Sequence, residues 1–173
     1  MALIKNWDNN TWLSSKDYIR SFSKFLIQNT KLNFKSEILD IGCGRGKISG
    51  NLYSELKLTS KPIGIDIVNH KDKDKRVKFK KSNGLTFLNK NKNFFDLILI
   101  KQTIHLLKMN EITKLINLCK KSLKSKGVIV VLTLDPNKNE IPTFKLMNTK
   151  LENSLNRDKK IITLLKKNNK VLK

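Results

Sequence analysis

The chain has 173 residues, which is enough for one domain with a buried core and too few for two. It carries 36 basic and 14 acidic residues, a formal net charge of +22, and two cysteines that lack the spacing of a zinc site or a disulfide framework. It shows neither a membrane-spanning apolar stretch nor a signal-peptide pattern, so we expect a cytoplasmic protein without a metal and without a membrane partner.

The high charge has two interpretations. A strongly basic chain can bind nucleic acid or another anionic surface. However, 32 of the 36 basic residues are lysine, asparagine occurs 20 times and alanine once. Lysine and asparagine have AT-rich codons, so drift of a genome toward AT would give the same composition. Because arginine, which makes bidentate contacts to bases, is scarce, we favour codon bias over polyanion binding.

Helix and strand patterns alternate along the chain. Apolar residues at helical spacing predict helices over 16–28, 48–56 and 112–123, and Gly127 is expected to end the third. Short apolar runs predict five strands, over 37–41, 62–68, 77–79, 95–100 and 128–134. Lysines alternate with the apolar residues of the third strand, which predicts a place near a sheet edge.

These strands predict an α/β fold. Strands without alternating polarity are buried on both faces, which is typical of a parallel sheet covered by helices on each side. We expect a doubly wound, mainly parallel sheet of about five strands, with helices on both faces. The chain would be a single domain, 1–173, made of a helical N-terminal cap (1–35), a core (36–135) and a basic helical tail (136–173).

A glycine-rich turn follows the first strand, in the segment ILDIGCGRGK. Its glycines at alternate positions, Gly42, Gly44 and Gly46, permit positive φ angles and let a ligand approach the backbone. The N–H groups at the start of the following helix would then face that ligand. A nicotinamide or flavin site would favour G-x-G-x-x-G, whereas this turn reads G-x-G-x-G with Asp40 two residues before the first glycine.

That turn resembles motif I of the class I S-adenosylmethionine (SAM) dependent methyltransferases, which have a Rossmann-like fold. The resemblance implies that SAM is the cofactor, that the turn, with Cys43, wraps its methionine and ribose, and that Asp40 helps to orient its ammonium group. The segment IGIDI resembles motif II and puts Asp66 24 residues after Gly42. An acid at the end of the second strand can accept hydrogen bonds from both ribose hydroxyls, with Ile67 beside it in the cofactor site.

The resemblance continues in register over about residues 16–135. Asn83, followed by Gly84, stands where the family usually has an acid near the adenine amino group; its amide oxygen can accept from that amine, or it can be a turn residue. Lys101 and Gln102 end the fourth strand, at the lip where α/β sheets bind ligands. His105 occupies a position where the family often has histidine, and is either a weak candidate for a catalytic base or a helix-start residue bonded to backbone.

Family sheets usually have seven strands in the order 3-2-1-4-5-7-6, and only five can be assigned here. Strands six and seven are therefore expected to be missing, which leaves the strand over 128–134 as an open apolar edge. We expect either a truncated form of a longer protein or a partner that covers this edge, such as a second copy in a homodimer.

Several classes of methyl acceptor are disfavoured because the residues that they require in this family are missing. The family's motif for methylating exocyclic base amines, its cysteine nucleophile for cytosine and the aspartate of its ribose methyltransferases are not found at the expected places. A small-molecule acceptor is therefore the first choice. The alternatives are an RNA- or protein-directed methyltransferase and a SAM-binding module without catalysis.

Aromatic residues Trp7, Trp12 and Tyr18 could face the sulfonium or anchor the first helix in the core.

Overall fold

The computed structural model describes residues 15–132 and 163. Trp7, Trp12 and the predicted tail lie outside the described residues. The elements in chain order are α1 (Lys16–Asn29), β1 (Ile38–Ile41), α2 (Lys47–Glu55), β2 (Ile63–Asp66), β3 (Lys78–Lys81), α3 (Gly84–Leu88), β4 (Phe95–Lys101), the 3₁₀ turn η3 (Ile104–Leu106), α4 (Met109–Ser122) and β5 (Leu123–Leu132).

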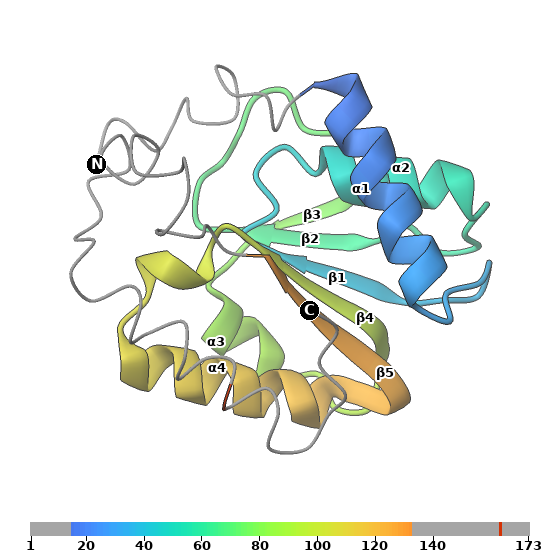
Figure 1. Cartoon of the computed structure of the whole chain (residues 1–173). Coiled ribbons are helices and arrows are strands. Elements are labelled where there is room, and N and C mark those ends of the chain that lie inside the picture. The colour runs from blue at the N-terminus through green and yellow to red at the C-terminus, as the bar shows by residue number, and fades with distance from the viewer. Residues whose placement is uncertain (1–14, 133–162, 164–173) are drawn as a thin grey trace.

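The five strands form one sheet in the order β3-β2-β1-β4-β5, and every neighbouring pair is parallel. Helices α1 and α2 lie on one face of the sheet, and α3 and α4 lie on the other (Figure 1). The predicted doubly wound parallel sheet is confirmed, as is the place of the lysine-rich strand β3 at its edge.

Alternate residues of the central strands point to opposite faces. Ile38 packs with Leu26 of α1 and Leu52 of α2, whereas Leu39 belongs to the cluster formed by α3 and α4. All four residues of β1 are buried. This burial on both sides explains why the central strands read as continuous apolar runs.

The beginning of β5 differs from the prediction. Helix α4 ends at Ser122 without a glycine stop, and Gly127 lies inside β5, where the pairing with β4 shifts register. A Cβ atom on Gly127 would lie 2.7 Å from the carbonyl oxygen of Phe95. Gly127 is therefore required by close backbone approach at an irregularity of the sheet, and the prediction that it ends the helix is wrong.

The outer side of β5 is the other edge of the sheet. Within residues 15–132 its strand partner is β4 alone. Residues 133–162 and 164–173, which would test whether the tail covers this edge, lie outside the described part, so that expectation stays a prediction. No helix of the described residues is long and apolar enough to cross a membrane.

Candidate functional site

The glycine turn lies at the carboxyl ends of the central strands. Gly42, Gly44 and Gly46 have φ angles of 68°, 55° and 72°, which glycine adopts without strain. The N–H groups of Gly42 and Cys43 both donate to the carbonyl oxygen of Ile65, at 2.8 and 3.1 Å. These bonds hold the turn against the end of β2.

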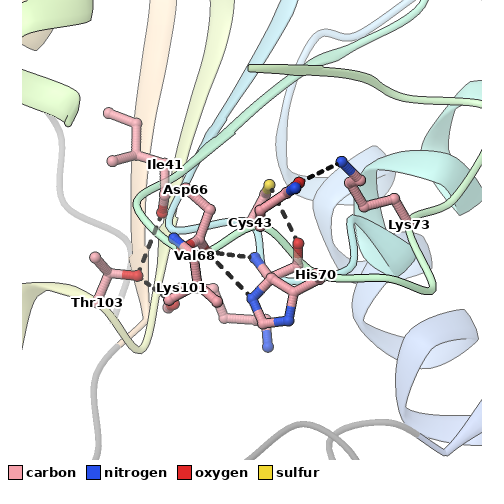
Figure 2. A network of polar contacts seen from close by, with 10 residues as sticks. Ile41, Cys43, Asp66, Val68, His70, Lys73, Lys101 and Thr103 are labelled. Atoms are coloured by element: carbon pink, nitrogen blue, oxygen red, sulfur yellow. Dashed lines mark hydrogen bonds and ion pairs between the residues drawn. The ribbon is translucent and has the colours of Figure 1, made fainter. Parts of the chain in front are cut away.

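Gly42 also sets the spacing between the ends of β1 and β4. A Cβ atom at this position would lie 1.9 Å from Oγ1 of Thr103. Thr103 uses that hydroxyl to donate to the carbonyl oxygens of Ile41, at 3.3 Å, and of Lys101, at 3.0 Å (Figure 2). The lip of β4 can therefore lie against the turn only because residue 42 has no side chain.

Asp66 faces the same turn from the end of β2. Its Oδ2 accepts a hydrogen bond from the N–H of Gly44, and its Oδ1 accepts one from the N–H of Val68, both at 2.8 Å. The side chain is only 12% exposed. A carboxylate offers about four acceptor positions, so further positions are left for a ligand.

His70 is a site residue that the sequence did not point to. Its Nε2 lies 4.0 Å from Oδ2 of Asp66, and its side chain is 14% exposed (Figure 2). It belongs to the lysine-rich loop between β2 and β3, where no motif marks it. The spacing of four residues after the acid becomes informative only once the loop is seen to fold back over the end of β2.

Asp40 and Cys43 lie behind the turn. Asp40 is 3% exposed and accepts a hydrogen bond from Ser49 Oγ of α2, at 2.5 Å. The sulfur of Cys43 packs so closely against Gly64 that a Cβ there would lie 2.8 Å from it. The described contacts of both side chains thus fasten the turn to the sheet and to α2.

The residues after β2 and β3 differ in exposure and role. Ile67 is 65% exposed, an unusual position for a large apolar side chain directly after the site acid. Asn83 caps α3, because its Oδ1 accepts from the N–H of Leu85 at 2.8 Å. A Cβ on Gly84 would lie 3.1 Å from a methyl group of Ile41, so this glycine serves close packing of α3 on the sheet.

Gln102 has an uncommon conformation at the lip of β4. Its φ angle is 50°, in the left-handed region, and the residue is only 9% exposed. Its N–H donates to the carbonyl oxygen of Leu132 at 2.7 Å, but its Oε1 has no hydrogen-bond partner among the described residues. Such a backbone costs about 1–3 kcal/mol and is concentrated at ligand sites.

Lys101 and Tyr18 meet above the same lip. The ammonium of Lys101 lies 5.9 Å from the centre of the Tyr18 ring, and burial raises the pKa of the tyrosine to about 12. The phenol therefore stays protonated at neutral pH, and its ring face lies toward the ammonium. His105 lies in η3, but its side chain is not among those that the structure describes.

Gly42, Gly44, Asp66 and Gln102 are thus brought to one edge of the sheet, as the strand order requires. The described residues contain no group of His, Cys, Asp or Glu that could hold a metal ion.

Comparison with known proteins assigns the family. Residues 32–172 match a family model described as a methyltransferase domain. The chain belongs to the class I SAM-dependent methyltransferases. Its cofactor is therefore S-adenosylmethionine. No curated protein sequence matches the chain.

Solved structures share the fold at low identity. A SAM-dependent methyltransferase from Archaeoglobus fulgidus is 21% identical, with a TM-score of 0.69 over 92% of this chain and 72% of that one. The 1,6-didemethyltoxoflavin-N1-methyltransferase of Burkholderia thailandensis is 16% identical, with a TM-score of 0.57 over 75% and 60% of the two chains. Phosphoethanolamine N-methyltransferase 1 of Haemonchus contortus is 14% identical, with a TM-score of 0.60. The match extends over 75% of this chain and 30% of that enzyme.

The residues at the carboxyl edge of the sheet fit SAM. A carboxylate with remaining acceptor positions suits the ribose hydroxyls, and the buried Oε1 of Gln102 can accept from an ammonium group. The exposed Ile67 offers an apolar surface for the adenine ring. No position of this set requires a metal.

Proposed function

We propose that the chain is an enzyme that transfers the methyl group of SAM to a small-molecule acceptor at the carboxyl edge of its sheet. The observation that carries the proposal is the hydrogen bond between the N–H of Gly44 and the carboxylate of Asp66, at 2.8 Å. It joins the glycine turn and the site acid into one preformed surface for a nucleoside with an amino-acid tail.

Each predicted cofactor residue has a role in this proposal. Asp66 accepts from the ribose hydroxyls, Ile67 packs on adenine, and the main chain of Gly42 to Gly46 passes along the methionine. Asp40 and Cys43 hold the turn in place through their contacts with Ser49 and Gly64 and do not themselves contact SAM. Asn83 would keep its cap to Leu85 and use the second lone pair of Oδ1 for the adenine amine, beside Gly84.

The lip of β4 would hold the methionine end. Gln102 Oε1 accepts from the ammonium, and the side chain of Lys101, on the ring of Tyr18, binds the carboxylate. Bound SAM supplies an electrophilic methyl group on a positively charged sulfur. The contribution of the protein is then mainly to position the acceptor in line with that methyl group.

The small-molecule acceptor is supported by the sequence motifs and by the structural neighbours. The chain lacks the base-amine, cysteine and ribose motifs that mark nucleic-acid acceptors in this family. Two structural neighbours, from Burkholderia and Haemonchus, have small-molecule substrates in their names. His105 remains a candidate base, and an acceptor that is already anionic would need none.

Two other functions are kept because specific observations favour them. The net charge of +22, with exposed lysines along β3, favours an RNA or protein acceptor. The lack of a convincing catalytic base in the sequence, together with Asn83 in place of the family's usual acid, favours a SAM-binding module without turnover.

One experiment separates these candidates. The full chain is incubated with methyl-labelled SAM and, in parallel, with fractionated small molecules, RNA and protein. Label in a small-molecule fraction supports the proposal. Label in RNA or protein supports the directed alternative, and SAM binding without transfer to any fraction supports the binding module.

A further inference from the structure

The polar surroundings of Asp66 contain one side chain that no motif accounts for. Two of its three described contacts come from main-chain amides, of Gly44 and Val68. The third is the imidazole of His70, whose Nε2 is 4.0 Å from Oδ2. This separation is too long for a direct hydrogen bond.

The separation of these two atoms is one that a single hydroxyl oxygen can bridge from the side. A hydroxyl oxygen at about 2.7–2.9 Å from both atoms fits between groups 4.0 Å apart, with a bent arrangement. A hydroxyl can donate to the carboxylate and accept from an imidazole N–H at the same time. The pair therefore offers one acceptor and one donor to a single hydroxyl group.

The burial of the pair favours a ligand over solvent as its partner. The side chains of His70 and Asp66 are 14% and 12% exposed. Polar groups at that depth are normally hydrogen-bonded, and a ligand hydroxyl would supply both the donor that Asp66 can accept from and the acceptor that His70 can donate to. The loop that carries His70 leaves the end of β2 directly after the acid and brings the imidazole beside the Asp66 carboxylate (Figure 2).

We propose that His70 is a second ribose-binding residue, which donates a hydrogen bond from Nε2 to a ribose hydroxyl that Asp66 accepts from. The inference rests on the proposed SAM site and adds to it a residue that the family motifs do not contain. It requires Nε2 to carry a proton, which holds for the imidazolium and for one of the two neutral tautomers.

The test uses the intact chain and calorimetry with 5′-methylthioadenosine and its 2′-deoxy and 3′-deoxy counterparts. His70→Leu keeps the approximate size of the side chain and removes the donor. We expect it to bind the ribose ligand about tenfold more weakly than wild type. For one of the two deoxy ligands, the one that lacks the bridging hydroxyl, His70→Leu and wild type should bind equally.

Two further variants keep the test decisive. His70→Gln ends in an N–H donor and should recover part of the affinity that His70→Leu loses. Asn69→Ala alters the neighbouring exposed residue of the same loop and should bind like wild type. Thermal unfolding checks that each variant is folded.

The inference is overturned if folded His70→Leu binds 5′-methylthioadenosine as tightly as wild type does. It is also overturned if the affinity of this variant falls by the same factor for 5′-methylthioadenosine and for both deoxy ligands. It is also overturned if His70→Gln binds more weakly than His70→Leu. If wild type itself binds neither S-adenosylhomocysteine nor 5′-methylthioadenosine, the proposed SAM site fails as a whole, which is a different result.

Discussion

The main-chain N–H of Gly44 donates to Oδ2 of Asp66 at 2.8 Å, although 22 residues separate them in the sequence. The bond joins a turn that follows β1 to the acid that ends β2. Parallel neighbours in a sheet end at the same edge, so the two halves of a nucleotide site meet there without a further connection.

Replacement of Asp66 by alanine should weaken S-adenosylhomocysteine binding by about 100-fold, because hydrogen bonds to a charged acceptor contribute roughly 1.5–3 kcal/mol each. Calorimetry on the folded variant measures this. Glu55→Ala, which removes an exposed carboxylate at the end of α2 that is remote from the glycine turn, is the matched control and should bind normally. An unchanged affinity of Asp66→Ala would remove this residue from the site.

Replacement of Gly44 by valine should abolish binding and leave the domain folded. The φ angle of 55° disfavours a β-branched residue, and the new side chain would occupy the surface that we assign to the ligand. Circular dichroism reports the fold, and calorimetry reports binding. If the folded variant still binds S-adenosylhomocysteine normally, the glycine turn is not part of the site.

Lys101→Gln should weaken the binding of S-adenosylhomocysteine about tenfold and leave the binding of 5′-methylthioadenosine unchanged, because only the first ligand carries a carboxylate. The reason is the place of the ammonium over Tyr18 at the lip of β4. Lys114→Gln, an exposed lysine on α4, serves as control. An equal effect of Lys101→Gln on both ligands would show that its ammonium does not bind the methionine carboxylate.

The sequence predicted those parts of the fold that depend on local pattern. The continuous apolar runs of β1 and β4, and the alternating lysines of β3, placed these strands correctly as central and edge. The prediction for Gly127 is wrong because a glycine after a helix usually ends that helix, whereas here the deciding contact is with Phe95, 32 residues away.

At the site, too, local sequence patterns predicted some residues, whereas contacts between distant residues could not be predicted. The turn glycines and Asp66 were found through spacing along the chain. The opposition of Gly42 to Thr103, the left-handed backbone of Gln102 and the approach of His70 to Asp66 are tertiary contacts. No local pattern encodes them, since each depends on how two strand ends or a loop come together.

An ion pair outside the site makes stability depend on pH. Arg76 donates from Nε and Nη2 to the two carboxylate oxygens of Asp74, at 2.9 and 2.8 Å, and these bonds hold the pKa of Asp74 below its usual value of 3.8. A carboxyl group with a lowered folded-state pKa stabilises the fold above the unfolded-state pKa, and this contribution is lost as pH falls through the folded-state value.

Arg76→Gln should therefore lower the free energy of unfolding by about 1–2 kcal/mol at neutral pH, a modest effect because the guanidinium is partly exposed. The difference from wild type should shrink below about pH 4, where Asp74 becomes protonated in the unfolded chain and then in the fold. Urea unfolding at neutral and acidic pH measures both values. If the free energies of unfolding of wild type and Arg76→Gln differ by the same amount at neutral and at acidic pH, the Arg76–Asp74 pair does not stabilise the fold through its charges.

RNA binding should be weak, non-specific and lost at moderate salt, because the basic surface is rich in lysine and poor in arginine. Fluorescence anisotropy with labelled RNA of several sequences, at rising salt, tests this. Sequence-selective binding that persists at physiological salt would favour an RNA acceptor over a small molecule.

The most direct test of the SAM site is a crystal structure of the full chain with S-adenosylhomocysteine. We predict the ribose hydroxyls within hydrogen-bond distance of Asp66, the adenine against Ile67 and the methionine end along the glycine turn. A ligand bound away from the carboxyl ends of β1 and β2, or with its ribose directed away from Asp66, would contradict the site proposed for this chain.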